Sequence, residues 1–167
     1  KQVASHFGGT RNAIAISWPK KIKAAGELRT QFHHVIDIAP TIYEIAGIEA
    51  PEYVNGIKQM PIHGTSMTYS FESASSPSTH KTQYFEILGN RAMYHEGWIA
   101  SCFHGRLPWI RLQGFEFDGP QEVWELYNVA EDFSQAVDLA KSEPKKLKEL
   151  QELFERHAKK FGIYPLR

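Results

Sequence analysis

The segment 82–103 most constrains the fold, because two tight turns divide it into short stretches rich in β-forming residues. The stretch TQYFEIL (82–88) precedes a turn at residues 89–90, and RAMYHEGWIASCF alternates in polarity and turns again at residues 96–97. Strands joined by such short turns run antiparallel. A further stretch, EVWELYNV (122–129), supplies another strand. The sequence therefore predicts a small antiparallel sheet in the second half of the chain.

A long amphipathic helix follows this predicted sheet. Ser142 is a candidate N-cap, and Pro144 falls in the first turn, where its missing N–H costs little. Large apolar residues recur at helical spacing along one face: Leu147, Leu150, Phe154 and Phe161. A helix of this length laid across a small antiparallel sheet predicts a compact α+β subdomain.

The first half of the chain has a different pattern. Ala13–Ser17 (AIAIS) reads as a short buried strand, of the kind found near the end of a parallel sheet. A helix follows, with Asp37 as N-cap, Pro40 in its first turn and Gly47 as its stop. Strand, loop and helix in this order indicate the tail of an α/β domain. Residues 48–81 read as a connector.

The predicted fold is therefore an α/β tail followed by a small α+β subdomain. The expected division places residues 1–70 in the first part, as the last strand and helix plus a connecting loop. Residues 71–167 form the second part, an antiparallel sheet with its packed helix.

Composition narrows the function classes. The formal net charge of the 167 residues is zero, which removes the usual electrostatic argument for binding nucleic acid. No apolar run approaches the roughly 18–20 residues of a membrane span. The single Cys102 excludes an internal disulfide. The compartment stays open between the cytoplasm, the periplasm and the exterior.

The residues themselves give no complete active site. Ser66, in HGTSM, lacks the Gly-x-Ser-x-Gly setting of a hydrolase nucleophile. His33 and His34 are adjacent, so in a regular element their side chains point in different directions, and a structural role is preferred over metal binding. Cys102 lies in a predicted strand and reads as a small buried hydrophobe.

Four motifs in order carry a family likeness. They are K-(x6)-GG-x-R followed by an apolar stretch and Trp-Pro, then HHVIDIAPTIYEIAGI, NGIKQMPIHGTSM and WELYNVAEDFSQAVDLA. Together they resemble the C-terminal portion of the type I, formylglycine-dependent sulfatases of the alkaline phosphatase-like superfamily. Within that family, the sequence is most similar to the larger bacterial arylsulfatases. The resemblance implies that the first part of the chain is the tail of an alkaline phosphatase-like domain.

The resemblance also implies an activity for a longer parent protein, the hydrolysis of sulfate esters. Lys1 matches the family's lysine, with the role of contacting a sulfate oxygen and the leaving-group oxygen. It is preferred over Lys20 and Lys21, which lie beyond the expected strand. For His6 two roles stay open, substrate binding and packing against the loop.

Other parts of the family's apparatus are not found in this chain. The formylglycine nucleophile and the Ca²⁺ ligands are implied for the parent, so the chain needs the N-terminal catalytic portion of the same protein as its partner. Cys102 departs from the family's nucleophile motif, because His104 occupies the position of its Pro or Ala. We expect the chain to be inactive alone.

Two alternatives remain at this point. The parent is a phosphonate or phosphate monoester hydrolase of the same superfamily, or the chain is a non-catalytic binding module. The residues upstream of Lys1 would separate the first alternative from a sulfatase. We also expect residues 1–70 by themselves to be poorly ordered or oligomeric, because an unpartnered apolar strand edge invites association.

Overall fold

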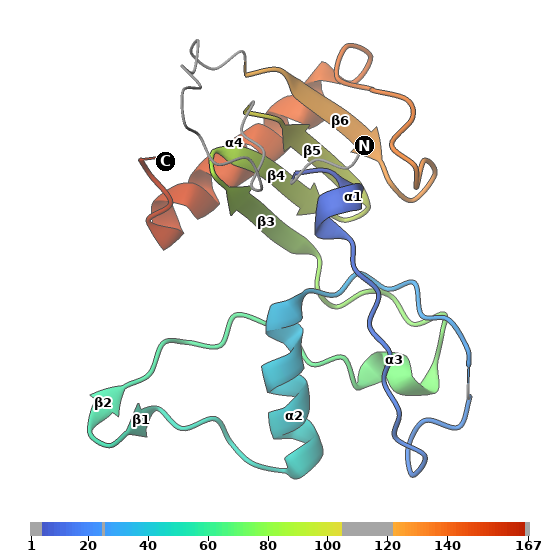
Figure 1. The fold of residues 1–167 in the computed structure, drawn as a ribbon, viewed down its shortest axis with the longest axis vertical. Coiled ribbons are helices and arrows are strands. Elements are labelled where there is room, and N and C mark those ends of the chain that lie inside the picture. Colours follow the sequence, from blue (N-terminus) through green and yellow to red (C-terminus); the bar gives the residue numbers. More distant parts are fainter. Residues whose placement is uncertain (1–4, 25, 105–121, 166–167) are drawn as a thin grey trace, which may run out of the picture. The chain divides into compact units, whose positions relative to one another are not determined.

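The computed structural model describes residues 5–24, 26–104 and 122–165. The contacts between its residues divide the chain into two compact units, one formed by residues 1–13 with 82–167 and the other by residues 14–81 (Figure 1). The division expected between residues 70 and 71 stays a prediction. Each unit is described by itself below.

The first unit contains the predicted antiparallel sheet. Its strands are β3 (Thr82–Ile87), β4 (Asn90–His95), β5 (Trp98–Cys102) and β6 (Trp124–Asn128), and they lie side by side in that order. All three pairings are antiparallel, with Ile87 opposite Asn90 and His95 opposite Trp98 at the turns. The predicted sheet is thereby confirmed.

Both turns require a backbone that most residues avoid. Leu88 and Gly89 have φ angles of 50° and 82°, and Glu96 and Gly97 have φ angles of 45° and 86°. These positive values give the turns the twist that two-residue hairpins need. A Cβ at Gly89 would also overlap the imidazole ring of His104, so this turn demands glycine for space as well as for conformation.

Helix α4 (Pro144–Phe161) covers one face of the sheet. The two elements share an apolar core that contains Met93, Ala100, Leu126, Leu150, Phe154 and Ala158. The ring of Phe161 stacks on Tyr84 with 5.3 Å between centroids. The predicted helix is confirmed, although Glu143 precedes its first residue and the Ser142 hydroxyl donates to the carbonyl of Leu139 instead of capping the helix.

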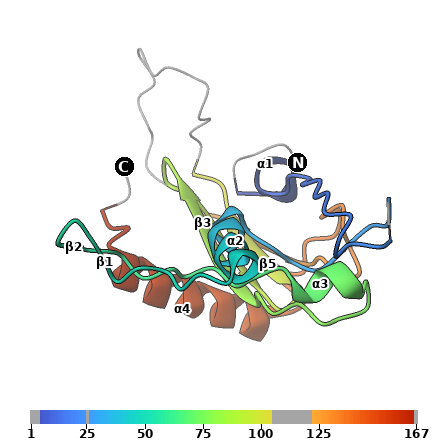
Figure 2. The same cartoon turned by 90° about the horizontal axis from the view of Figure 1, so that it is seen from below.

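The opposite face of the sheet is covered by the N-terminal segment of the chain. Ala92, Ile99 and Tyr127 form a second buried cluster, and Phe7 packs against it from the short helix α1 (Phe7–Thr10). Figure 2 shows α1 and α4 on opposite sides of the sheet. The middle strands β4 and β5 are therefore buried along almost their whole length, because period-2 alternation sends successive side chains to α4 and to the N-terminal segment in turn.

The second unit is built around helix α2 (Ile38–Ala46), which a 3-10 turn at Val35–Asp37 precedes. Gly47 ends the helix with a φ of 65°, as predicted. Asp37 does occupy the N-cap position, but its side chain makes no capping hydrogen bond to the helix. The connector holds the two-residue strands β1 (Tyr53–Val54) and β2 (Ile57–Lys58) and the short helix α3 (Tyr69–Glu72).

The strand expected at Ala13–Ser17 is not formed. These residues belong to no regular element, and the side chains of Ile14 and Ile16 are 57% and 41% exposed. The prediction was wrong for the described structure because a strand needs a neighbouring backbone for its hydrogen bonds, and no described strand pairs with this stretch. Across the same described residues, no helix joins the length of a membrane span to the low charge that a bilayer interior requires.

Candidate functional site

Lys1, the principal site residue predicted from the sequence, lies outside the described residues. The first described residue, Ser5, is buried on the sheet. The hydroxyl of Ser101 in β5 donates a 2.8 Å hydrogen bond to the carbonyl of Ser5, and the amide of Phe7 donates one of 2.8 Å to the side chain of Gln135. The backbone on both sides of His6 is therefore fixed to the first unit.

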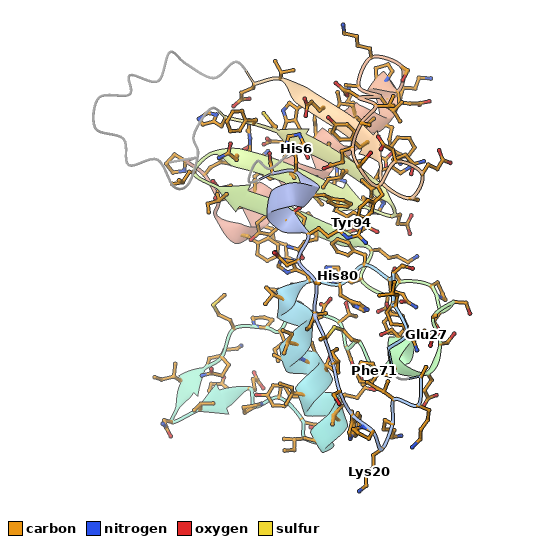
Figure 3. All side chains as sticks on the ribbon, turned by 45° about the vertical axis from the view of Figure 1, so that its right-hand side comes forward. His6, Lys20, Glu27, Phe71, His80 and Tyr94 are labelled. Atoms are coloured by element: carbon orange, nitrogen blue, oxygen red, sulfur yellow. The ribbon has the colours of Figure 1, made fainter. Side chains whose placement is uncertain are left out.

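His6 itself is 1% exposed and lies at the start of α1 (Figure 3). Its Nε2 atom forms a hydrogen-bonded pair with the carboxylate of Glu125 in β6. The hydroxyl of Tyr127 donates a 2.9 Å hydrogen bond to the same oxygen of Glu125, and its ring meets the imidazole edge-on at a centroid distance of 6.1 Å. These contacts are those expected of a residue that packs within the fold. Substrate binding, the other role left open for His6, stays a prediction.

The Gly-Gly-Thr-Arg motif forms the turn that follows His6. The amides of Gly9 and Thr10 donate to the carbonyl of His6 at 2.8 and 2.9 Å. The guanidinium of Arg11 lies 4.0 Å from the ring centroid of Phe133 and 5.4 Å from that of Phe7. Cation–π contacts of this kind hold the arginine against the loop after β6. Within the described residues the motif therefore has a structural role, since it holds the N-terminal segment against the loop after β6.

A second polar cluster lies in the other unit, around the fully buried Asp37. The Nδ1 atom of His80 lies 2.8 Å from each oxygen of its carboxylate, and Nδ1 of His33 lies 3.6 Å from one of them. The amides of His34 and Thr65 each donate to this carboxylate at 2.8 Å. Burial by itself raises the pKa of Asp37, but these hydrogen bonds outweigh it and hold that pKa well below its usual range.

The cluster also explains two of the four motifs. Thr41 donates its hydroxyl to the carbonyl of Asp37 at 2.6 Å and accepts a hydrogen bond from the amide of Met67 at 2.9 Å. A Cβ at Gly64 would overlap the carbonyl oxygen of Ile36, so only glycine allows this close approach. Asp37 and Thr41 belong to the motif HHVIDIAPTIYEIAGI, whereas Gly64 and Met67 belong to NGIKQMPIHGTSM, so the two motifs contact each other in this cluster.

Ser66 and Cys102, which the sequence did not favour as nucleophiles, both make contacts typical of structural residues. The hydroxyl of Ser66 lies 3.1 Å from that of Thr68, which donates to Glu44 at 2.6 Å. Cys102 is fully buried, and burial raises the pKa of its thiol, although Arg91 donates to Sγ at 3.7 Å. Neither residue has the setting of an activated nucleophile.

The described residues do not fit a calcium site. Among them, no three His, Cys, Asp or Glu side chains are grouped so that they could hold a metal ion. Calcium takes about six to eight oxygen ligands, whereas the Asp37 cluster offers a single carboxylate surrounded by imidazoles. The described residues therefore offer no set of ligands for the Ca²⁺ that the resemblance implies.

Sequence reasoning missed Glu125, Tyr127 and the pairing of Asp37 with His80. For Glu125 a signal was present, since it alternates with Trp124 and Leu126 and shares the face of Tyr127. A charged residue in the middle of a strand that is covered on both faces needs a partner. That partner, His6, lies 119 residues away in the sequence, where no local pattern identifies it.

Comparison with known proteins assigns the chain to a class. Residues 7–160 match the family described as "N-sulphoglucosamine sulphohydrolase, C-terminal". The fold is also similar to that of a protein solved in complex with its substrate D-glucosamine-2-N,6-O-disulfate, with a TM-score of 0.57 and 20% identity. This likeness covers 89% of the chain and 28% of that protein, and it confirms the predicted fold class.

The chain belongs to this family of sulfatase C-terminal domains. It is 28% identical over 156 residues to an N-acetylglucosamine-6-O-sulfatase of Bacteroides thetaiotaomicron, covering 90% of the chain and 25% of the relative. It is also similar to the crystal structure of Ps i-CgsB, with a TM-score of 0.57 and 23% identity, over 83% of the chain and 27% of that protein. The chain thus spans about a quarter of the length of the relatives it matches.

Proposed function

We propose that this chain is the C-terminal part of an enzyme that hydrolyses sulfate esters. The observation that carries the proposal is the match of residues 7–160 to the C-terminal family of a sulphohydrolase. The relatives add support, because one is an N-acetylglucosamine-6-O-sulfatase and another was solved with a disulfated glucosamine as its substrate. A sulfated amino sugar is therefore the first substrate to test.

Lys1 is proposed to contact a sulfate oxygen and the leaving-group oxygen. An ammonium group is a compact point charge that offsets the charge of a spherical anion. When the ester bond to sulfur breaks, negative charge develops on the departing oxygen, and a fixed cation close to that atom lowers the barrier. For His6 we retain a substrate-binding role as a secondary proposal.

The N-terminal catalytic portion of the same protein is the proposed partner. Helix α2 supports this, because its isoleucines are exposed: Ile38 is 36%, Ile42 is 59% and Ile45 is 41% accessible. Apolar side chains grouped on one helix face gain free energy when a partner surface covers them. On this proposal the formylglycine and the Ca²⁺ belong to the N-terminal portion, and the isolated chain is inactive.

The test is an assay of the longer protein that contains this chain. Glucosamine-6-sulfate and 4-nitrophenyl sulfate are offered beside the matching phosphate monoesters and a phosphonate monoester. We expect sulfate release with a kcat/KM well above that for phosphate or phosphonate. A preference for a phosphate or phosphonate ester would replace the proposal with the other hydrolase class, and turnover of no ester would reject it.

Lys1→Ala tests the residue assignment within the same assay. Loss of one charge-stabilising group typically lowers kcat by about 100- to 1,000-fold, and we expect a loss in this range. Lys20→Ala is the matched control, since Lys20 is exposed and lies beyond the GG-x-R loop. Near-normal turnover of Lys1→Ala would remove Lys1 from the site.

A further inference from the structure

We propose that Glu125 and Tyr127 of β6 are positioning residues, which act through His6 to fix the segment from which Lys1 reaches the sulfate. This inference rests on the proposed function. It deepens that function by giving the C-terminal subdomain a part in holding the active-site lysine. Neither residue is proposed to touch the substrate.

The His6–Glu125 pair lies beside a buried apolar cluster. Ala92 and Ile99 are fully buried on this face of the sheet, together with the ring of Tyr127. The side chains of His6 and Glu125 are only 2% and 23% exposed. Placing a carboxylate and an imidazole in such a setting costs desolvation free energy, and an apolar pair of similar volume holds two elements together at least as well. The pair therefore fixes the orientation of His6 on the sheet, because a hydrogen bond forms only in a narrow range of geometries.

The connections around His6 reinforce that geometry. Glu125 is itself oriented by the hydroxyl of Tyr127 at 2.9 Å. The backbone before and after His6 is held by Ser101 and Gln135, at 2.8 Å in each case. Three independent contacts, from β5, β6 and the loop after β6, thus meet on residues 5–7.

The position of Lys1 in the chain makes this anchor relevant to the reaction. Three residues lie between Lys1 and Ser5, so the Cα of Lys1 lies within about 14 Å of that of Ser5 even in a fully extended chain. A shift of about 1 Å in a group that contacts the reacting atoms costs on the order of 100-fold in rate. Loosening the anchor therefore lowers turnover through Lys1, without removing any group from the site.

The experiment measures Glu125→Gln in the longer protein with its sulfate ester. Glutamine keeps the volume but removes the charge that orders the imidazole. We expect kcat/KM to fall by about 10- to 100-fold. Glu131→Gln, at an exposed position in the turn after β6, is the matched control and keeps the parent rate. Tyr127→Phe, which removes one hydroxyl, gives a smaller loss of the same kind.

The Lys1→Ala background separates positioning from general stability. If Glu125 acts through Lys1, Glu125→Gln causes no further loss of kcat/KM once Lys1 is alanine, because the two changes remove one effect. A loss of equal size in both backgrounds, or no loss in the parent background, would overturn the inference.

Hydrogen exchange provides a readout that does not depend on activity. In the longer protein, Glu125→Gln should speed amide exchange in residues 5–10 while α4 keeps the exchange of the parent. Unchanged exchange in residues 5–10 would overturn this inference while leaving the proposed function intact. A longer protein that cleaves no sulfate ester would reject the proposed function, and the catalytic part of the inference with it, even where the exchange result shows that Glu125 holds the segment.

Discussion

His80 holds both carboxylate oxygens of Asp37 within 2.8 Å of its Nδ1 atom, across 43 residues of sequence. This single contact ties the start of helix α2 to the end of the connector, just before the first strand of the sheet. The carboxylate is fully buried and also accepts two backbone amides. It is thus the polar centre of the second unit, and the first three predictions concern it and its surroundings.

Asp37→Asn should destabilise the second unit by about 3 kcal/mol, because it leaves His80 and the two amides around a group that cannot accept all their hydrogen bonds. The measurement is the hydrogen-exchange protection of the α2 amides, which reports opening of this unit. Glu49→Gln, an exposed carboxylate just beyond α2, is the control and should change protection by less than about 0.5 kcal/mol. Equal protection in both variants would contradict the assigned role of Asp37.

Stability of the same unit should fall with decreasing pH in two stages. Burial and the charge of His80 lower the pKa of His34 from 6.5, and hydrogen bonds hold the pKa of Asp37 below 3.8. A group whose pKa is lower in the folded protein contributes stability above its unfolded pKa and loses it as the pH falls. Protection of α2 should therefore decline below about pH 6.5 and more steeply below about pH 4. In Asp37→Asn the second decline should vanish, and a decline parallel to that of the wild type would count against this account.

Gly64→Ala should cost at least about 3 kcal/mol, since the new methyl group would overlap the carbonyl of Ile36 and force the two backbone segments apart. The control is Gly56→Ala. Gly56 has a φ of 78° and no atom within 4 Å of an added Cβ, so only its left-handed strain of about 1 kcal/mol remains. Denaturant unfolding of the two variants compares them. Equal losses would show that the close approach at Gly64 is relaxed in solution.

Cys102 should resist thiol reagents in the folded chain. It is fully buried, and burial raises its pKa, so little thiolate forms and little of it is reached. With 5,5′-dithiobis(2-nitrobenzoate) at pH 8, we expect labelling to follow unfolding, and to be complete only in denaturant. Rapid labelling of the native protein would mean that β5 opens locally.

Ile42→Asp should destabilise the longer protein but not the isolated chain. Ile42 is 59% exposed on α2, so the change should leave the stability of the isolated chain within about 0.5 kcal/mol. In the longer protein, where the N-terminal portion is proposed to cover this face, a buried unpaired carboxylate should lower the melting temperature and the yield of folded enzyme. Glu49→Gln again provides the control. An unaffected longer protein would place the docking surface elsewhere.

The elements that sequence predicted well are those whose determinants lie close together in the chain. The turn at residues 96–97 and the apolar stripe of α4 need only a few neighbouring residues to be recognised. The first turn was expected at residues 89–90 and lies one residue earlier, at Leu88 and Gly89, because Asn90 already pairs with Ile87 in the sheet. Gly47 ended α2 where expected, through its left-handed backbone. Local propensity and periodicity carry this information directly.

The expectations that failed or stayed incomplete depend on distant partners. Ala13–Ser17 has the composition of a strand, but hydrogen-bonding neighbours decide whether a strand forms. His6 and Glu125 lie 119 residues apart in the chain, and nothing in the sequence around His6 indicates an acidic partner. Asp37 reads as a helix cap, yet its carboxylate is occupied by His80 and Thr65. In each case the tertiary contact outweighs the local pattern.

The packing of residues 5–7 on the face of the sheet opposite α4 has a practical consequence for dividing the protein. A piece cut to begin at residue 71 would contain the four described strands of the sheet and all of α4, and would look complete on a domain map. It would nonetheless expose Ala92, Ile99 and Tyr127 to water and leave the carboxylate of Glu125 without its imidazole. The first unit is thus discontinuous in sequence, and a shortened protein that preserves it must keep residues 5–7 together with its strands and α4.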